Sequence, residues 1–203
     1  MAAQHSTRSH LSLEQGLGIA EMASSAQRLI ILQDLANGYL AGHGQGPQKQ
    51  DPAWSDLASE VGQETARLAQ LARHNRKGLL GKGAALEANY KSALASAQLD
   101  EATKHKIAAG IDAKGGFVAY VTSSLDSLDS DLPAQRESFF ALADHMATGA
   151  ADQARTESLV NTAIKQLIVC GLYGAAAGAA AATGNVVGFI MACAGAVNAG
   201  CFG

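Results

Sequence analysis

Aromatic residues are scarce in this sequence, because only 5% of its 203 positions are Phe, Trp or Tyr. The chain also has only three prolines and few runs of Val, Ile or Thr. A β-sandwich or β-barrel needs β-branched and aromatic side chains to cover its pleated surfaces. Their scarcity argues against these folds and favours an all-α protein.

Large side chains are sparse overall, since alanine fills 42 positions and glycine 22. Hydrophobic residues that recur every three or four positions, interrupted by Gly, Pro and Asp, predict an all-α bundle of six to eight helices. The expected helices span residues 12–41, 51–75, 84–97, 100–112, 117–128 and 133–147, and a last helix begins near 151 and continues into the C-terminal region. The expected breaks are 42–50, 78–83, 115–116, 129–132 and a point near Gly149.

Charged residues disappear from the sequence after Lys165. The last 38 residues contain no Asp, Glu, Lys, Arg or His, and 11 of them are Ala and 8 are Gly. Composition therefore divides the chain into a water-compatible helical part, 1–165, and an apolar part, 166–203. Exposure of the apolar part to water is unfavourable unless protein or lipid covers it. Residues 1–10 are polar and lack the apolar core of a Sec signal peptide, so we expect no such signal there.

The charge-free segment has the pattern of a helical hairpin. Its local breaker is Thr183-Gly184-Asn185, which separates a first arm, 167–182, from a second arm, 186–202. Small residues recur every four positions on both arms, and such a face lets two helix backbones approach closely. The predicted packing seams are Cys170, Gly174, Gly178 and Ala182 on the first arm and Gly188, Ala192, Ala196 and Gly200 on the second.

The length of each arm limits a membrane-spanning interpretation. An arm of 16 or 17 residues is about 25 Å long, whereas the hydrocarbon core of a bilayer is about 30 Å thick. Three arrangements stay open at this point. The hairpin is buried in the helical domain, it leaves that domain to enter a bilayer, or it packs with copies of itself.

The three cysteines all lie in the charge-free segment, and their positions indicate one disulfide. Residues that face each other across a turn at 183–185 have numbers that sum to roughly 370, and Cys170 and Cys201 meet this condition. Their disulfide would close a loop of about 30 residues, constrain the unfolded chain by about 3–4 kcal/mol and leave Cys193 free. The alternative is that all three are small buried thiols in a reducing cytosol.

No pattern typical of an enzyme stands out. The six histidines show no HxxxH or HExxH spacing, and the segment 78–83 lacks the spacing and hydroxyl of a phosphate-binding loop. Asp126, Asp129 and Asp131 lack the Gly and Glu of a calcium loop, which favours roles in turns and caps. We therefore expect a non-enzymatic protein without catalytic residues, cofactor or metal.

Basic residues are concentrated between positions 65 and 86, a stretch without acidic residues. The members of this basic island are Arg67, Arg73, Arg76, Lys77 and Lys82. Such an island could bind anionic lipid or nucleic acid, but a solvated helix end that complements the helix dipole is the favoured interpretation. The island has no aromatic residues to stack on bases, so no nucleic-acid partner is expected.

The motif Cys170-Gly171-Leu172-Tyr173 precedes a run rich in Ala, Gly and Val at the end of a helical chain. This combination resembles the sporulation-delaying-protein-C family of killer-peptide precursors. In that family a hydrophobic, disulfide-containing peptide is cut from a larger secreted precursor and collapses the membrane potential of target bacteria. The resemblance implies a toxic segment at 166–203 and a soluble carrier domain at 1–165. It also implies a secreted or membrane-associated location, with the bilayer of a target cell, a processing protease and an immunity protein as partners.

Two classes of function follow. The first is the precursor of a membrane-permeabilising, bacteriocin-like antimicrobial peptide whose active segment is C-terminal. The second is a structural or interaction protein whose hairpin is buried in its own core or in an oligomer formed by self-association. Small-residue seams favour the first class, because Leu and Phe would fill a soluble core more efficiently.

Overall fold

Helices make up most of the chain that the structure describes, and short turns connect them. That structure is a computed structural model, and it describes residues 2–42, 51–146 and 153–202, among which no strand occurs. The elements are the α-helices α1 (Ala2–Gly42), α2 (Pro52–Leu80), α3 (Gly83–Ser96), α4 (Glu101–Ala113), α5 (Phe117–Asp126), α6 (Leu132–Met146), α7 (Gln153–Thr183) and α8 (Val186–Asn198), with the π-helical turn η1 (Ser127–Asp131) between α5 and α6. The predicted all-α bundle is confirmed.

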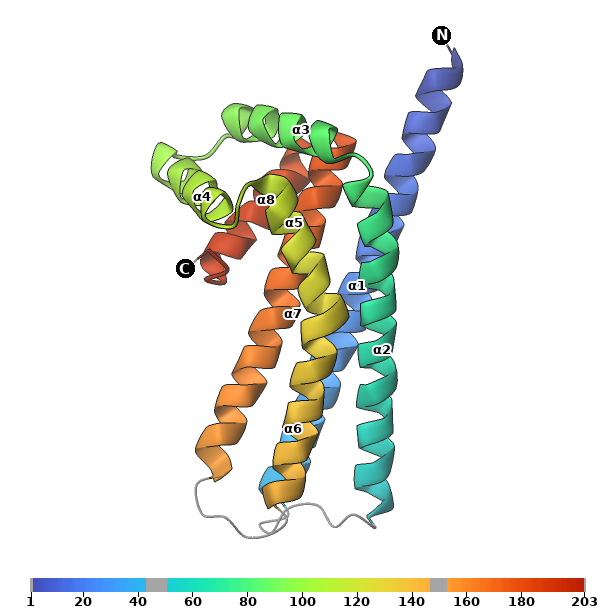
Figure 1. Cartoon of the computed structure of the whole chain (residues 1–203), viewed down its shortest axis with the longest axis vertical. Coiled ribbons are helices and arrows are strands. Elements are labelled where there is room, and N and C mark those ends of the chain that lie inside the picture. Colours follow the sequence, from blue (N-terminus) through green and yellow to red (C-terminus); the bar gives the residue numbers. More distant parts are fainter. Residues whose placement is uncertain (1, 43–50, 147–152, 203) are drawn as a thin grey trace.

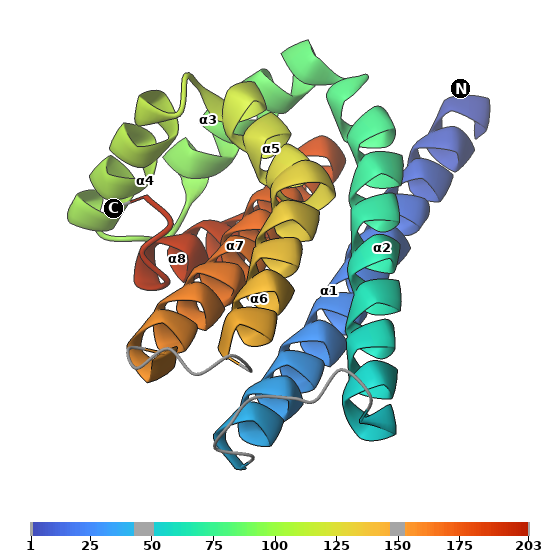
Figure 2. The same cartoon turned by 60° about the horizontal axis from the view of Figure 1, so that its bottom comes forward.

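The long helices run side by side along the molecule (Figure 1). They are α1, α2, α7 and the rod formed by α5, η1 and α6, and α7 contacts α1, α5 and α6. The shorter α3, α4 and α8 lie around one end of this bundle (Figure 2). The core runs through both parts, and its largest fully buried side chains include Met22, Leu29, Leu68, Leu86, Ile107, Phe117, Phe139 and Phe189.

Aspartate side chains cap the starts of α2 and α4. Asp51 precedes Pro52 and accepts a hydrogen bond from the Ala53 amide, at 2.9 Å, and Asp100 caps α4 by accepting from the Thr103 amide. The end of α2 differs from the expectation, because the helix continues through 78 and ends at Leu80. Leu79 is fully buried there, and the packing of this side chain outweighs the weak helix preference of Gly78.

The turn predicted at 129–132 is wrong, because the chain remains helical through it. The amide of Leu132 donates to the carbonyl of Ser127, five residues back, which is the π-helical pattern. This wider turn accommodates Pro133, which has no amide hydrogen to donate. It also keeps Leu128 and Leu132 buried, so core packing is continuous across it.

The other predicted boundaries have mixed outcomes. Helix α1 begins at Ala2 rather than at residue 12, and no Gly or Pro interrupts residues 2–11. Gly42, the first residue of the loop expected at 42–50, is the last residue of α1. The rest of that loop and the expected break near Gly149 lie outside the described residues. The compositional boundary near residue 165 falls inside α7, which continues through it to Thr183.

Candidate functional site

The C-terminal hairpin turns where the sequence predicted. Helix α7 ends at Thr183 and α8 begins at Val186. Gly184 between them has a φ of 71°, a left-handed conformation that glycine adopts without a steric penalty. The side chain of Asn185 then accepts a hydrogen bond from the Gly188 amide, at 2.9 Å, and caps α8.

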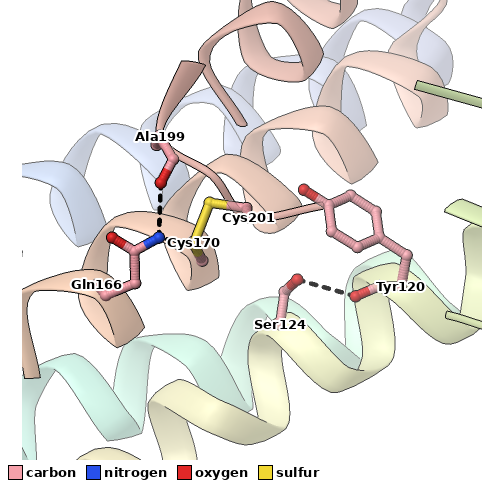
Figure 3. The surroundings of a disulfide bond; sticks show 6 residues. All are labelled: Tyr120, Ser124, Gln166, Cys170, Ala199 and Cys201. Atoms are coloured by element: carbon pink, nitrogen blue, oxygen red, sulfur yellow. Dashed lines mark hydrogen bonds between the residues drawn. A yellow bond between two sulfur atoms is a disulfide. The ribbon is translucent and has the colours of Figure 1, made fainter. Parts of the chain in front are cut away.

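The predicted disulfide between Cys170 and Cys201 is present, and their Cα atoms are 5.5 Å apart. It joins the middle of α7 to the turn that follows α8 (Figure 3). A hydrogen bond supports this link, because Gln166 Nε2 donates to the carbonyl of Ala199 at 2.6 Å. The disulfide and this hydrogen bond together hold the end of the hairpin against α7.

The third cysteine, Cys193, is free and fully buried. Burial raises the pKa of this thiol to about 12, so it stays protonated at neutral pH and is a poor nucleophile. Burial also raises the pKa of nearby Tyr90 to about 12, with smaller contributions from Asp112, Cys193 and Glu87. The surroundings of Cys193 are therefore those of an apolar core and not of an activated catalytic cysteine.

The first predicted seam lies against α5. The spacing of four predicted a close helix contact at Gly174 and Gly178 without identifying the helix that makes it, and both residues face side chains of α5. A Cβ at Gly178 would sit 2.8 Å from Val121, and one at Gly174 would overlap the side chain of Ser124. The two glycines therefore let the backbone of α7 approach the side chains of α5 closely.

Other members of the seams have individual roles. Ala192 and Ala196 are buried and Ala182 is partly buried, whereas Gly188 lies against Asn185 of its own cap. Gly200 follows the end of α8 with a φ of 72° and so belongs to a turn.

Sequence reasoning missed the close approach between the two arms. It is made at Gly195, where a Cβ would lie 2.6 Å from Cζ of the Tyr173 ring. It also missed Gly171, whose backbone lies against Leu128. The only available signal was the spacing of three between Gly171 and Gly174, which extends the glycine stripe of the first arm by one turn.

The inner face of α8 packs against two aromatic rings from other helices, which we call the aromatic seat. Phe189 is 1% exposed, and its ring centroid lies 5.9 Å from that of Tyr90 and 5.8 Å from that of Phe117. The seat is thus built by α3 and α5. The outer face of α8 is different, because Val187 is 68% exposed and Met191 71%. These two residues, one turn apart, form an apolar outer ridge.

Two members of the basic island are paired with acidic residues. Arg73 forms an ion pair with Asp129 at 2.7 Å, and Arg76 pairs with Asp126 at 2.9 Å. These pairs fasten α2 to the region around η1. Two charges of the basic island are therefore neutralised by ion pairs within the fold. The same pairs involve two of the three aspartates, Asp126 and Asp129, that were compared with a calcium loop.

One described helical stretch, Leu159–Thr183 in α7, is long and apolar enough to cross a membrane, with a mean hydropathy of 1.4. Half of its most apolar window is buried inside the protein, and a core helix of a water-soluble protein meets the same criterion. Helix α8 is apolar but shorter. Within the described residues, no group of three or more His, Cys, Asp or Glu side chains comes together to hold a metal ion.

Comparison with known proteins gives no relative for the chain: no family model, no curated protein and no solved structure matches it. The candidate site is therefore characterised by its own geometry. It is a disulfide-closed, charge-free helical hairpin whose inner face is packed in an aromatic seat and whose outer ridge is apolar and exposed.

Proposed function

We propose that the chain is the precursor of a membrane-permeabilising antimicrobial peptide whose active segment is the hairpin of residues 166–203. The main support for this proposal is that the two faces of α8, in a segment without any charge, differ in their exposure to water. Met191 and Val187 are exposed to water, while Phe189 and Cys193 are held inside the fold. A segment of this kind is stable in water only while other helices cover most of it.

The remaining helices act as the soluble carrier in this proposal. Helix α5 covers the glycine face of α7, and α3 and α5 cover the inner face of α8. The same small-residue faces that fit these helices also suit helix association in lipid, where close backbone contact replaces the hydrophobic effect. The proposed partners are the bilayer of a target cell, a protease that frees the hairpin and an immunity protein.

A second candidate is a structural or interaction protein that keeps the hairpin permanently in its core. The specific observation in its favour is the fit of Gly174 and Gly178 against Ser124 and Val121, which makes α7 a central helix of the fold. The two candidates differ in one respect that can be measured, because only the first requires the isolated hairpin to act on membranes.

The test measures the membrane potential of bacterial cells with a potential-sensitive dye after addition of the oxidised peptide 166–203. We expect depolarisation at micromolar peptide. A peptide with Met191→Lys should be much weaker, because a charge at the bilayer centre costs about 2.5–3.5 kcal/mol, whereas Met191→Leu should retain activity. An unchanged potential, or equal activity of the Lys and Leu peptides, would overturn the proposal in favour of the structural hairpin.

A further inference from the structure

The chain beyond α8 is fastened at several points. Cys201 is bonded to Cys170 of α7, and its amide donates to the carbonyl of Ala196 at 2.9 Å. The carbonyl of Ala199 accepts from Gln166 (Figure 3). This C-terminal turn, residues 199–202, therefore has a fixed position relative to both arms of the hairpin.

The fixed turn places Phe202 between two other helices. Its side chain covers the backbone of Gly110 in α4 so closely that a Cβ there would lie 2.5 Å from Phe202 Cβ. Its ring centroid also lies 5.2 Å from that of Tyr120 in α5. Phe202 thus links the disulfide-bonded turn to α4 and α5.

Helix α4 has few other attachments. Its buried residues are Ile107, Gly110 and Ile111, and open clefts lie along two of its sides. One of about 420 Å³ is lined by α4 and by Gly200 and Phe202 of the C-terminal turn. Another of about 590 Å³ is lined by α3 and α4. A helix with few buried residues and open clefts beside it belongs to the part of a fold that opens most easily.

The disulfide itself is accessible to a reductant. Both Cys170 and Cys201 are partly exposed, whereas Cys193 is fully buried. Burial raises the pKa of the Cys193 thiol and keeps it protonated, so an external thiolate is the nucleophile that reduces the disulfide. The bond thus responds to the redox state of the surroundings.

We propose that the Cys170–Cys201 disulfide is a redox-operated latch that keeps α4 and α8 seated through the C-terminal turn and Phe202. A dithiol reductant supplies two electrons and two protons, the S–S bond breaks to give two thiols, and the reductant becomes a disulfide. The turn then loses its covalent attachment to α7, so Phe202, α4 and α8 are held by non-covalent contacts alone and open more often while the long-helix bundle remains folded. This response of the fold does not depend on membrane activity.

Hydrogen–deuterium exchange of the full chain, oxidised and after reduction with dithiothreitol, tests the latch. We expect amides in α4 and α8 to exchange about tenfold faster or more in the reduced chain, with α2 unchanged. The double variant Cys170→Ser, Cys201→Ser should show the reduced pattern without reductant. Phe202→Ala should accelerate exchange in α4 while the disulfide stays intact, and Met191→Ala, on the exposed ridge, is the control that should not.

Two results would overturn the latch. The first is unchanged exchange in α4 and α8 after reduction, with alkylation of both thiols confirmed by mass. The second is faster exchange in α2 to the same degree as in α8, because the disulfide would then stabilise the whole fold and not one part of it.

Discussion

The backbone of Gly178 lies so close to the side chain of Val121 that a Cβ at residue 178 would sit 2.8 Å from Val121 Cγ1. Real Cβ atoms essentially never approach a heavy atom this closely, and Val121 is fully buried and has no room to move away. Helices α5 and α7 can therefore lie this close only because residue 178 of α7 has no side chain. This contact connects the apolar hairpin to the rest of the bundle.

The first prediction concerns this contact. Gly178→Ala should lower the free energy of unfolding by about 1–3 kcal/mol, because an added methyl group overpacks the interface. Gly38→Ala is the matched control, since nothing lies within 4 Å of a Cβ at that helical glycine, and it should raise stability by about 0.5–1 kcal/mol. Urea unfolding measures both. Equal shifts in the two variants would mean that α5 and α7 do not pack as described.

The second prediction concerns high pH. Burial raises the pKa of Cys193 from 9.0 to about 12, so the neutral thiol is favoured in the folded state. Its contribution to stability is fully present below pH 9 and is lost as the pH rises towards 12, on the order of 1 kcal/mol per pH unit. Tyr90 and Tyr120 add to the loss, because burial raises the pKa of both phenols.

The thermal midpoint of the chain should therefore fall steeply between pH 9 and 12. In Cys193→Ala the fall should be shallower, because one of the titrating groups is gone while the two tyrosines remain. Scanning calorimetry across this range, on both proteins, measures the difference. If the thermal midpoints of the two proteins fell in parallel with pH, the Cys193 thiol would not have a raised pKa and would be in contact with water.

The third prediction concerns acidic pH. Burial alone would raise the pKa of Glu64, but hydrogen bonds from Arg28 and Ser25 and the positive charges of Arg28 and Arg67 outweigh it, and the pKa is lowered from 4.5. The carboxylate of Glu64 accepts from Arg28 Nε at 3.1 Å and from Ser25 Oγ at 2.5 Å. Its contribution to stability is therefore present above pH 4.5 and is lost as the pH falls through its lower folded pKa.

The variant Glu64→Gln should remove this part of the acid dependence. Compared with the unmodified chain, it should be less stable at pH 7 but lose less of its stability between pH 5 and 2. Urea unfolding at several pH values provides the comparison. If both proteins lose stability in parallel, the link between α1 and α2 is not electrostatic.

The fourth prediction concerns the approach of the two arms at Gly195 and Tyr173. Gly195→Leu in the oxidised peptide 166–203 should separate the arms and reduce its permeabilising activity several-fold, because the hairpin associates through close backbone contact. Val187→Leu, on the outer ridge, adds bulk without touching the other arm and should leave the activity unchanged. Dye release from vesicles measures both peptides.

Local features of the hairpin could be predicted from the sequence, because they depend on neighbours along the chain. Gly184 followed by Asn185 marks a turn wherever it occurs in an apolar helical segment, and the pairing of Cys170 with Cys201 follows from that turn. The partner of the glycine stripe could not be predicted. A spacing of four puts Gly174 and Gly178 on one helix face, but it does not say which helix covers that face.

The same limit explains the other differences. The sequence shows Pro133 but not that Leu128 and Leu132 are both buried in the core, so a turn and a continuous helix could not be told apart there. The pairing of Arg73 with Asp129 joins residues 56 positions apart, so the basic island could only be described as a cluster of charge. The position of Phe202 over Gly110 likewise requires the three-dimensional arrangement of α4.

The central claim is that residues 166–203 act on membranes and that the rest of the chain shields them. The most direct measurement is dye release from phospholipid vesicles, with the oxidised peptide 166–203 and the oxidised full chain compared at equal molar concentration. We expect rapid release by the peptide and little release by the full chain. No release by the peptide, or equal release by both, would contradict it.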